Sequence, residues 1–309
     1  MFRIAFFNVL LSLLYMIPGY VFCKIKKAAP EHLSTMSYIL IYFCSPCMVL
    51  ASFLQLPRSK ENVWYMMLFF VFSLLIQVLF FLLLFLILRK KQENDVYRIM
   101  NVGAMLGNVG FFGLPLIRAL FPENPEVACY SCIFVTSMNL LVFTVGVYGV
   151  TGEKKYISVK NALINPASVA FLIAFPLYLL NAGEWCPKFL LNGIDIVGKM
   201  TTPLCMLILG IRLATIELKK LFTNGGVYIT CALKLLVFPL FGYGISLLFP
   251  LPDTFRYSVL ILCGTPCASV LLGMAEMHGK GMDKAANCIL LSTLLSILTL
   301  PLLALLIRR

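Results

Sequence analysis

The chain has 309 residues, of which 61% are hydrophobic and only 12% are charged. Soluble globular domains are about 45–50% apolar and about 25% charged, so this composition excludes an ordinary soluble fold. The sequence predicts an all-α polytopic membrane protein, in which apolar helices leave room for short connections and for no separate soluble domain.

The formal net charge of +12 does not predict a nucleic-acid partner, because the 25 Lys and Arg residues form no basic patch interleaved with aromatic residues. We expect the lipid bilayer, and no nucleic acid, as the partner of this surface. Only two His residues occur, which argues against His-based catalysis and against an intramembrane metal site. The eleven Cys residues are scattered through apolar segments, as is typical of packing residues. We therefore expect no cofactor and no metal.

Ten apolar segments, bounded by charged or turn residues, are long enough to be membrane helices, and we call them spans 1 to 10. In chain order they are Ile4–Phe22, Met36–Leu54, Trp64–Leu88, Ile99–Phe121, Ala128–Val150, Ala162–Leu180, Leu190–Ile211, Val227–Phe249, Tyr257–Met277 and Ala285–Ile307. The first segment resembles a signal peptide, but no convincing small-residue cleavage site follows it, so we predict a membrane helix there.

Residues 151–161 form a short, cytosolic linker between two halves of five spans each, 1–150 and 162–309. Two five-span halves of a common fold must have opposite orientations. Three pairs of Gly or Pro residues recur in the two halves at an offset of 157 or 158: Pro18 and Pro176, Pro46 and Pro203, Gly107 and Gly264. A constant offset predicts two inverted five-helix repeats. The alternative is that membrane helices are rich in Gly and Pro in any case.

Span 4 contains three Gly and one Pro in nine residues, Gly107-Asn108-Val109-Gly110-Phe111-Phe112-Gly113-Leu114-Pro115. An interior Gly costs a helix about 1 kcal/mol and an interior Pro about 3 kcal/mol, so we expect the helix to be broken here. Opened backbone is tolerated in a membrane only beside protein or a water-filled cavity. The alternative is a proline kink filled by packing.

Span 9 carries a second candidate break, Cys263-Gly264-Thr265-Pro266-Cys267-Ala268-Ser269. Gly ends helices easily, and we expect Thr265 to cap the next helix with Pro266 at its first position. Two broken helices would cross near the bilayer centre, where free N–H groups at half-helix N-termini favour an anion. Cys263 and Cys267 could instead be metal ligands, but no His or further thiolate accompanies them.

The glycine-rich stretch of span 4, the pair Thr265-Pro266 and the ten-span layout resemble the auxin efflux carrier family of membrane transport proteins. The family includes plant auxin exporters and bacterial carriers of malate and malonate type. The resemblance covers the whole chain. It implies that spans 4 and 9 cross at the substrate site. The short linker 151–161 favours the lean bacterial-type branch, because the plant exporters usually carry a long loop there.

The same resemblance implies an elevator mechanism, in which a transport domain of spans 3–5 and 8–10 moves against a scaffold of spans 1, 2, 6 and 7. It also implies a homodimer formed through the scaffold.

Further candidates for substrate binding lie in spans 3, 5 and 8. Lys234 is about 10 Å deep in span 8, where it would supply positive potential to an anion, although Lys side chains can also snorkel to the interface. Gln77 lies 157 residues earlier, so the repeat predicts that it faces Lys234, and the resemblance matches the two to a charged pair of the plant members. The residues predicted to bind substrate are Gln77, Gly107, Asn108, Gly110, Pro115, Asn139, Lys234, Thr265 and Pro266.

These features predict a secondary transporter of a small organic anion, such as a mono- or dicarboxylate, working by alternating access. An ATP-binding P-loop sequence is absent from the chain. A cation-coupled antiporter or symporter of similar fold and a non-transporting receptor for a small acid remain alternatives. An intramembrane enzyme is not expected, because no base accompanies the Ser and Cys nucleophiles at matched depth.

The distribution of Lys and Arg predicts a protein of the cell membrane with both termini outside the cytoplasm. The connections after spans 1, 3, 5, 7 and 9 hold 15 of these residues, whereas the opposite side, including both termini, holds 8. Tags at either end should therefore react with membrane-impermeant reagents in intact cells. Protection of either tag would contradict this topology.

Overall fold

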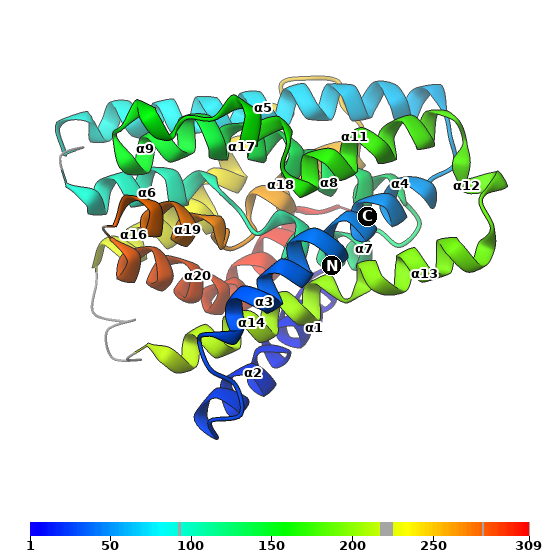
Figure 1. Ribbon diagram of the computed structural model, residues 1–309. Coiled ribbons are helices and arrows are strands. Elements are labelled where there is room, and N and C mark those ends of the chain that lie inside the picture. The colour runs from blue at the N-terminus through cyan, green and yellow to red at the C-terminus, as the bar shows by residue number, and fades with distance from the viewer. Residues whose placement is uncertain (92–93, 217–224, 280, 309) are drawn as a thin grey trace.

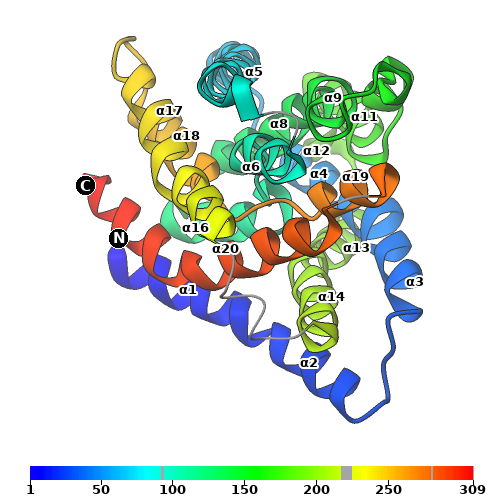
Figure 2. The ribbon, with the colours of Figure 1, turned by 90° about the vertical axis from the view of Figure 1, so that its left-hand side faces the viewer.

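The computed structural model describes residues 1–91, 94–216, 225–279 and 281–308 (Figures 1 and 2). These residues fold into helices, and the only β-structure among them is one isolated bridge. Four residues counted in the orientation prediction lie outside the described ranges: Lys219, Lys220, Lys280 and Arg309.

The helices of the first half follow predicted spans 1 to 5, with short π-helical turns joining some of the pieces. They are α1 (Phe2–Leu14), α2 (Met16–Lys24), α3 (His32–Ile39), α4 (Ser45–Leu54), α5 (Lys60–Leu88), α6 (Asp95–Met105), α7 (Leu114–Leu120), α8 (Glu126–Leu141) and α9 (Val147–Thr151). The π-helical turns are Leu40–Cys44, Val109–Gly113 and Val142–Gly146.

The helices of the second half follow spans 6 to 10 in the same manner. They are α10 (Val159–Leu163), α11 (Pro166–Leu179), α12 (Ala182–Trp185), α13 (Lys188–Lys199), α14 (Thr201–Thr215), α16 (Gly225–Ala232), α17 (Phe238–Ser246), α18 (Asp253–Cys263), α19 (Val270–His278) and α20 (Met282–Leu303). A π-helical turn, Leu233–Val237, joins α16 to α17.

Within the described ranges, seven continuous helical stretches are long and apolar enough to cross a membrane, and they correspond to spans 1, 2, 3, 5, 7, 8 and 10. Span 6 forms the shorter α11, of 14 residues, and spans 4 and 9 are each divided in the middle. A polytopic helical membrane protein is thus supported. The count of ten spans and the inverted repeat stay predictions.

The longest helix, α5, shows how the sequence sets one of these elements. Ser59 caps its N-terminus by accepting a hydrogen bond from the Asn62 N–H, and Glu61 in the first turn complements the helix dipole. The following residues are almost all apolar and include neither Gly nor Pro. One side of α5 is buried while Leu75 and Leu86 on the other are exposed, as suits a helix that contacts lipid.

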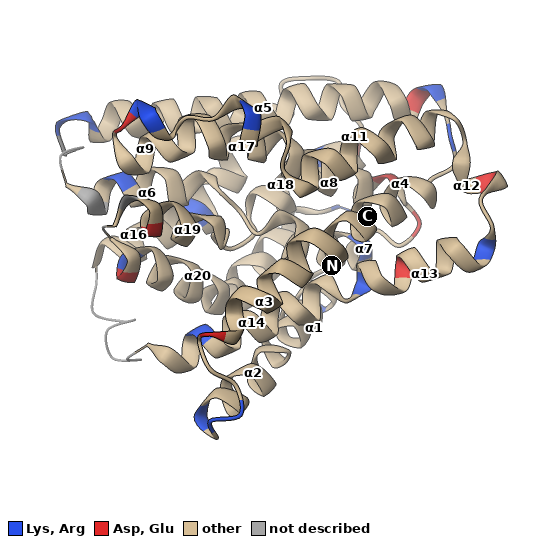
Figure 3. Ribbon diagram, viewed as in Figure 1, with Lys and Arg blue, Asp and Glu red and all other residues tan. Residues whose placement is uncertain are grey.

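Charged residues gather toward the two ends of the helical bundle and leave most of its middle free of charge (Figure 3). Lys234 is an exception, since its side chain is completely buried. This distribution fits a bilayer core between the two charged ends.

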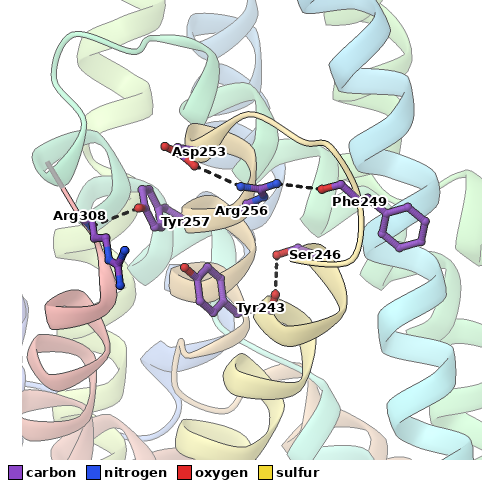
Figure 4. A network of polar contacts seen from close by, with 7 residues as sticks. All are labelled: Tyr243, Ser246, Phe249, Asp253, Arg256, Tyr257 and Arg308. Carbon is purple, nitrogen blue, oxygen red and sulfur yellow. Dashed lines mark hydrogen bonds and ion pairs between the residues drawn. The ribbon is translucent and has the colours of Figure 1, made fainter.

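The two termini lie side by side, because α1 packs along α20 (Figures 1 and 2). Figure 4 shows the polar contacts that tie the chain end to the start of α18. The Arg308 N–H donates to the Tyr257 hydroxyl at 3.2 Å, and Arg256 donates to the carbonyl of Phe249 and contacts Asp253. These contacts hold the last described residues against α18, next to the start of α1.

Helices α2 and α14 approach each other closely through small residues. A Cβ atom added to Gly19 would overlap the Leu207 carbonyl, and one added to Gly210 would overlap the Met16 carbonyl. Small residues allow membrane helices to pack backbone against backbone in this way.

Pro115 lies in the first turn of α7 and not at a break, in contrast to the predicted broken stretch that ended on it. Because Pro has no N–H, the Phe111 carbonyl loses the donor that a regular helix would supply four residues later. The Thr202 hydroxyl of α14 donates to this carbonyl at 2.7 Å. A side chain from the second half of the chain thus completes the backbone hydrogen bonding of the first.

We predict that Thr202→Val destabilises the protein by about 0.5–1.5 kcal/mol, because the partly buried Phe111 carbonyl loses the hydroxyl group that donates to it. The melting temperature in detergent would measure this loss. Thr136→Val is the matched control, since the buried Thr136 hydroxyl donates to the carbonyl of Cys132 four residues earlier in its own helix, which keeps its backbone N–H donor. Equal melting temperatures for the two variants would disprove the proposed bond.

Candidate functional site

Two unwound segments, residues 106–108 and 264–269, meet where they interrupt their helices. Gly107 and Cys267 form an isolated antiparallel bridge. The Asn108 N–H donates to the Pro266 carbonyl at 2.7 Å, and the Ala268 N–H donates to the Leu106 carbonyl at 3.1 Å. Spans 4 and 9 are therefore both broken, as predicted, and they cross. We call this pair of segments the crossing.

Neighbouring helices satisfy further backbone groups of the crossing. Ser292 of α20 accepts a hydrogen bond from the Cys267 N–H at 2.9 Å, and Ser131 of α8 donates to the Val109 carbonyl at 3.1 Å. The N–H groups of Asn108, Cys267 and Ala268 are thus bonded within the protein. They are not free to bind a substrate, contrary to the expectation from the sequence.

Thr265 and Pro266 lie in the unwound segment and do not start the next helix. The Thr265 hydroxyl donates to the Leu262 carbonyl in the last turn of α18, and α19 begins only at Val270. The expected capping role was therefore wrong. The carbonyls at the end of α18 lack helical donors, and Thr265 satisfies one of them.

Lys234 binds the end of α18, directly before the crossing. Its buried ammonium group donates to the Cys263 carbonyl at 2.7 Å and lies 4.7 Å from the centre of the Phe238 ring. Cys263 ends α18, where the carbonyls are unpaired and the helix dipole is negative. Lys234 stabilises this helix end, and it neither snorkels to the surface nor lines the cavity described below.

Gln77 is also completely buried, and its bonds run within the first half of the chain. Its amide N–H groups donate to the Ser73 carbonyl at 2.8 Å and to the Ser137 hydroxyl at 3.1 Å. Gln77 and Lys234 share no hydrogen bond among the described contacts, and that the two face each other stays a prediction.

A cavity of about 550 Å³ ends at the crossing, and we call it the main cavity. It is bounded by α3, α4, α8, α11, α14 and the start of α19. Four of the nine predicted site residues line it: Gly107, Asn108, Gly110 and Asn139. The other five do not: Gln77, Pro115, Lys234, Thr265 and Pro266.

The crossing end of the main cavity is suited to an anion. Residues 109–111, 269 and 270, at the N-termini of the two restarting half-helices, line it together with the amide of Asn108. The first N–H groups of a helix have no partner within the helix, and the helix dipole is positive there. The Asn108 amide donates only a long contact, 3.8 Å, to the Cys205 sulfur, so it can donate a stronger bond to a ligand.

Asn139 lines the cavity from α8, and its amide donates to the Asn165 side chain at 3.2 Å. Asn165 is a site residue that the sequence analysis missed, because it was assigned to the start of span 6 without a role. It caps α11 by accepting from the Ser168 N–H, so both amides are held in place.

Arg212 is the second residue that the sequence analysis missed. Among described residues it is the only charged one that lines the main cavity. Hydropathy had assigned it to the connection after span 7. The helical spacing of Cys205, Ile208 and Arg212 could have indicated the shared face, since residues at i, i+3 and i+7 lie on one side of a helix.

A second, smaller cavity of about 300 Å³ shares Met48 with the main cavity and reaches Arg118 near the end of α7. Asp195 and Lys199, which also line it, form a salt bridge, and Gln55 donates to the Asp195 carboxylate at 2.9 Å. The charges of the smaller cavity are thus partly neutralised.

We predict that Gly107→Ala destabilises the crossing, because the added Cβ would lie 2.5 Å from the Thr265 hydroxyl and 2.8 Å from the Lys234 ammonium. Overpacking of this kind costs about 1–3 kcal/mol and should lower the melting temperature. The control is Gly193→Ala on the exposed face of α13, where an added Cβ meets no atom within 4 Å. A Gly107→Ala protein as stable as the control would refute the close packing of the crossing.

The whole chain matches known membrane transport proteins. The membrane transport protein family matches residues 4–161 and 150–304. An uncharacterized transporter of Methanocaldococcus jannaschii is 25% identical over 305 residues, which cover 95% of this chain and 96% of that protein. An uncharacterized transporter of Methanothermobacter thermautotrophicus is 25% identical over 307 residues, which cover 96% of each chain. Together with the broken, crossing helices, these matches confirm the resemblance found in the sequence: the chain belongs to the membrane transport protein family.

Proposed function

We propose that this protein is a secondary transporter that moves a small organic anion across the cell membrane by alternating access. The observation that carries the proposal is the main cavity, which ends at the crossing of two broken helices. Its volume of about 550 Å³ falls in the usual range of small-molecule sites, about 300–1,000 Å³.

The substrate carboxylate would bind at the crossing, between Asn108 and the first turns of the two half-helices. Amide and backbone N–H donors bind carboxylates well in a site from which water is largely excluded. The apolar walls, which include Met48, Val135 and Phe143, would contact the body of the acid.

An arrangement of ten spans in two inverted repeats is the framework of this proposal. Two structural features support it: α6 and α18 are each 11 residues long, and each ends at a break, at Met105 and Cys263, 158 residues apart. The side-by-side termini are also expected when each repeat has an odd number of spans.

Alternating access is supported by the two cavities that share Met48. The main cavity reaches Arg212 and the smaller one reaches Arg118, and the distribution of Lys and Arg assigns these to the cytosolic and outer sides. The main cavity would then be the inward-open site. We further propose that spans 3–5 and 8–10 move against spans 1, 2, 6 and 7, and that spans 2 and 7 form a homodimer.

A cation-coupled antiporter or symporter is less well supported, because no acidic residue lines the main cavity in the described part of the chain. A non-transporting receptor would bind the acid in the same cavity, and only a flux measurement separates it from a carrier.

The test is uptake of radiolabelled mono- and dicarboxylates by proteoliposomes, with and without imposed pH and sodium gradients. We expect saturable uptake, and Asn108→Ala should weaken the apparent affinity about 10- to 150-fold, the usual range for a lost bond to a charged group. The control is Asn161→Ala, an exposed amide on α10 that does not line the cavity. Binding without uptake would indicate a receptor, and no saturable binding of any acid would overturn the proposal.

A further inference from the structure

The main cavity holds a second group suited to an anion, at a distance from the crossing. Arg212 is half-buried near the end of α14 and lines the cavity. In the described ranges its guanidinium group takes part in no salt bridge and in no side-chain hydrogen bond. Its charge is therefore available to a ligand.

The position of Arg212 relative to the crossing follows from helix geometry. Cys205, Ile208 and Arg212 line the cavity from one face of α14, and Cys205 contacts the Asn108 amide. Seven residues of helix correspond to a rise of about 10 Å between Cys205 and Arg212. Helical side chains lean toward the helix N-terminus, which for α14 is the end near the crossing. A guanidinium group that follows this direction would lie nearer to Asn108 than the rise between the two residues.

The main cavity has an anion-binding group at each of two ends, Asn108 at the crossing and Arg212 on α14, whereas a site for a single charge needs only one. A guanidinium group binds a carboxylate through two parallel hydrogen bonds and is more weakly hydrated than an ammonium group. The wall between the ends is apolar where Ile208 lines it. A monoacid bound at the crossing would leave Arg212 without a counter-ion in a partly buried place, which is unfavourable.

Building on the proposed function, we propose that Arg212 is a specificity-determining residue that binds a second carboxylate of the substrate. The carrier would then select short diacids over monoacids of the same length. The carboxylate at the crossing would fix one end of the diacid, and Arg212 would fix the other.

The competing explanation is that Arg212 only adds to the positive charge on the cytosolic side. In that case its removal would resemble removal of another cytosolic charge, such as Lys160, which is exposed on α10 and does not line the cavity. Lys160→Gln is therefore the matched control.

The experiment measures binding and uptake of malonate, succinate and glutarate, each against its monoamide, at pH 7.5. Diacid and monoamide differ little in size, so their affinity ratio reports the second charge. For at least one length we expect the wild-type protein and Lys160→Gln to prefer the diacid about 10- to 150-fold. Arg212→Gln should lose this preference while it keeps its affinity for the monoamide. Arg212→Lys should keep part of the preference, because an ammonium group binds without the two parallel bonds.

Two results would overturn the role of Arg212 and leave the proposed carrier intact: wild-type protein that transports diacid and monoamide equally well, and a diacid preference that survives in Arg212→Gln. A wild-type protein that binds none of the six probes, and no other acid of the uptake screen, would overturn both proposals. If Arg212→Gln does not fold, Arg212→Lys decides, since an unchanged preference in that variant excludes bidentate binding.

Discussion

Backbone groups inside a membrane must find hydrogen-bond partners within the protein, and the centre of this structure depends on that constraint. Each of the two broken helices would be costly alone. Each broken helix supplies a donor to a carbonyl of the other: the Asn108 N–H donates to the Pro266 carbonyl, and the Ala268 N–H donates to the Leu106 carbonyl. The site is therefore a product of two segments that are far apart in the sequence and cannot form separately.

The same constraint explains the buried charge of Lys234. An uncompensated charge in a membrane is strongly unfavourable, but the end of α18 presents a carbonyl, that of Cys263, and a negative dipole. Thr265 binds the neighbouring Leu262 carbonyl. Both polar side chains thus complete the end of one half-helix. Gly107 fits against them because it has no side chain, so the Gly at this position is required by packing as well as by the break in the helix.

The sequence predicted the membrane class, the family and both breaks, because Gly and Pro act on the backbone locally and hydropathy is a property of short segments. It placed Asn108 at the break of span 4 for the same reason, and the structure shows that this residue lines the main cavity. It could not predict which other side chains line the cavity, because that depends on how helices from the two halves pack. Pro115 was assigned to the break, yet it lies in the first turn of α7, and the Phe111 carbonyl four residues earlier accepts from Thr202, 91 residues away in the sequence. Arg212 was missed because hydropathy alone placed it in a connection.

The backbone hydrogen bonds of the crossing, and the side-chain bonds from its helices to α4 and α14, constrain how the proposed carrier would move. Separating Asn108 from Pro266 would leave unpaired backbone groups in the membrane, so the crossing should move as one body. The contacts from the crossing helices to α4 and α14 are single side-chain bonds, such as Arg118 to Ser52 at 3.2 Å and Thr202 to Phe111. Each of these is worth about 0.5–3 kcal/mol and can be exchanged for a bond to water in an opening cavity. The boundary between moving and fixed parts should therefore follow these side-chain bonds, with α4 and α14 on the fixed side.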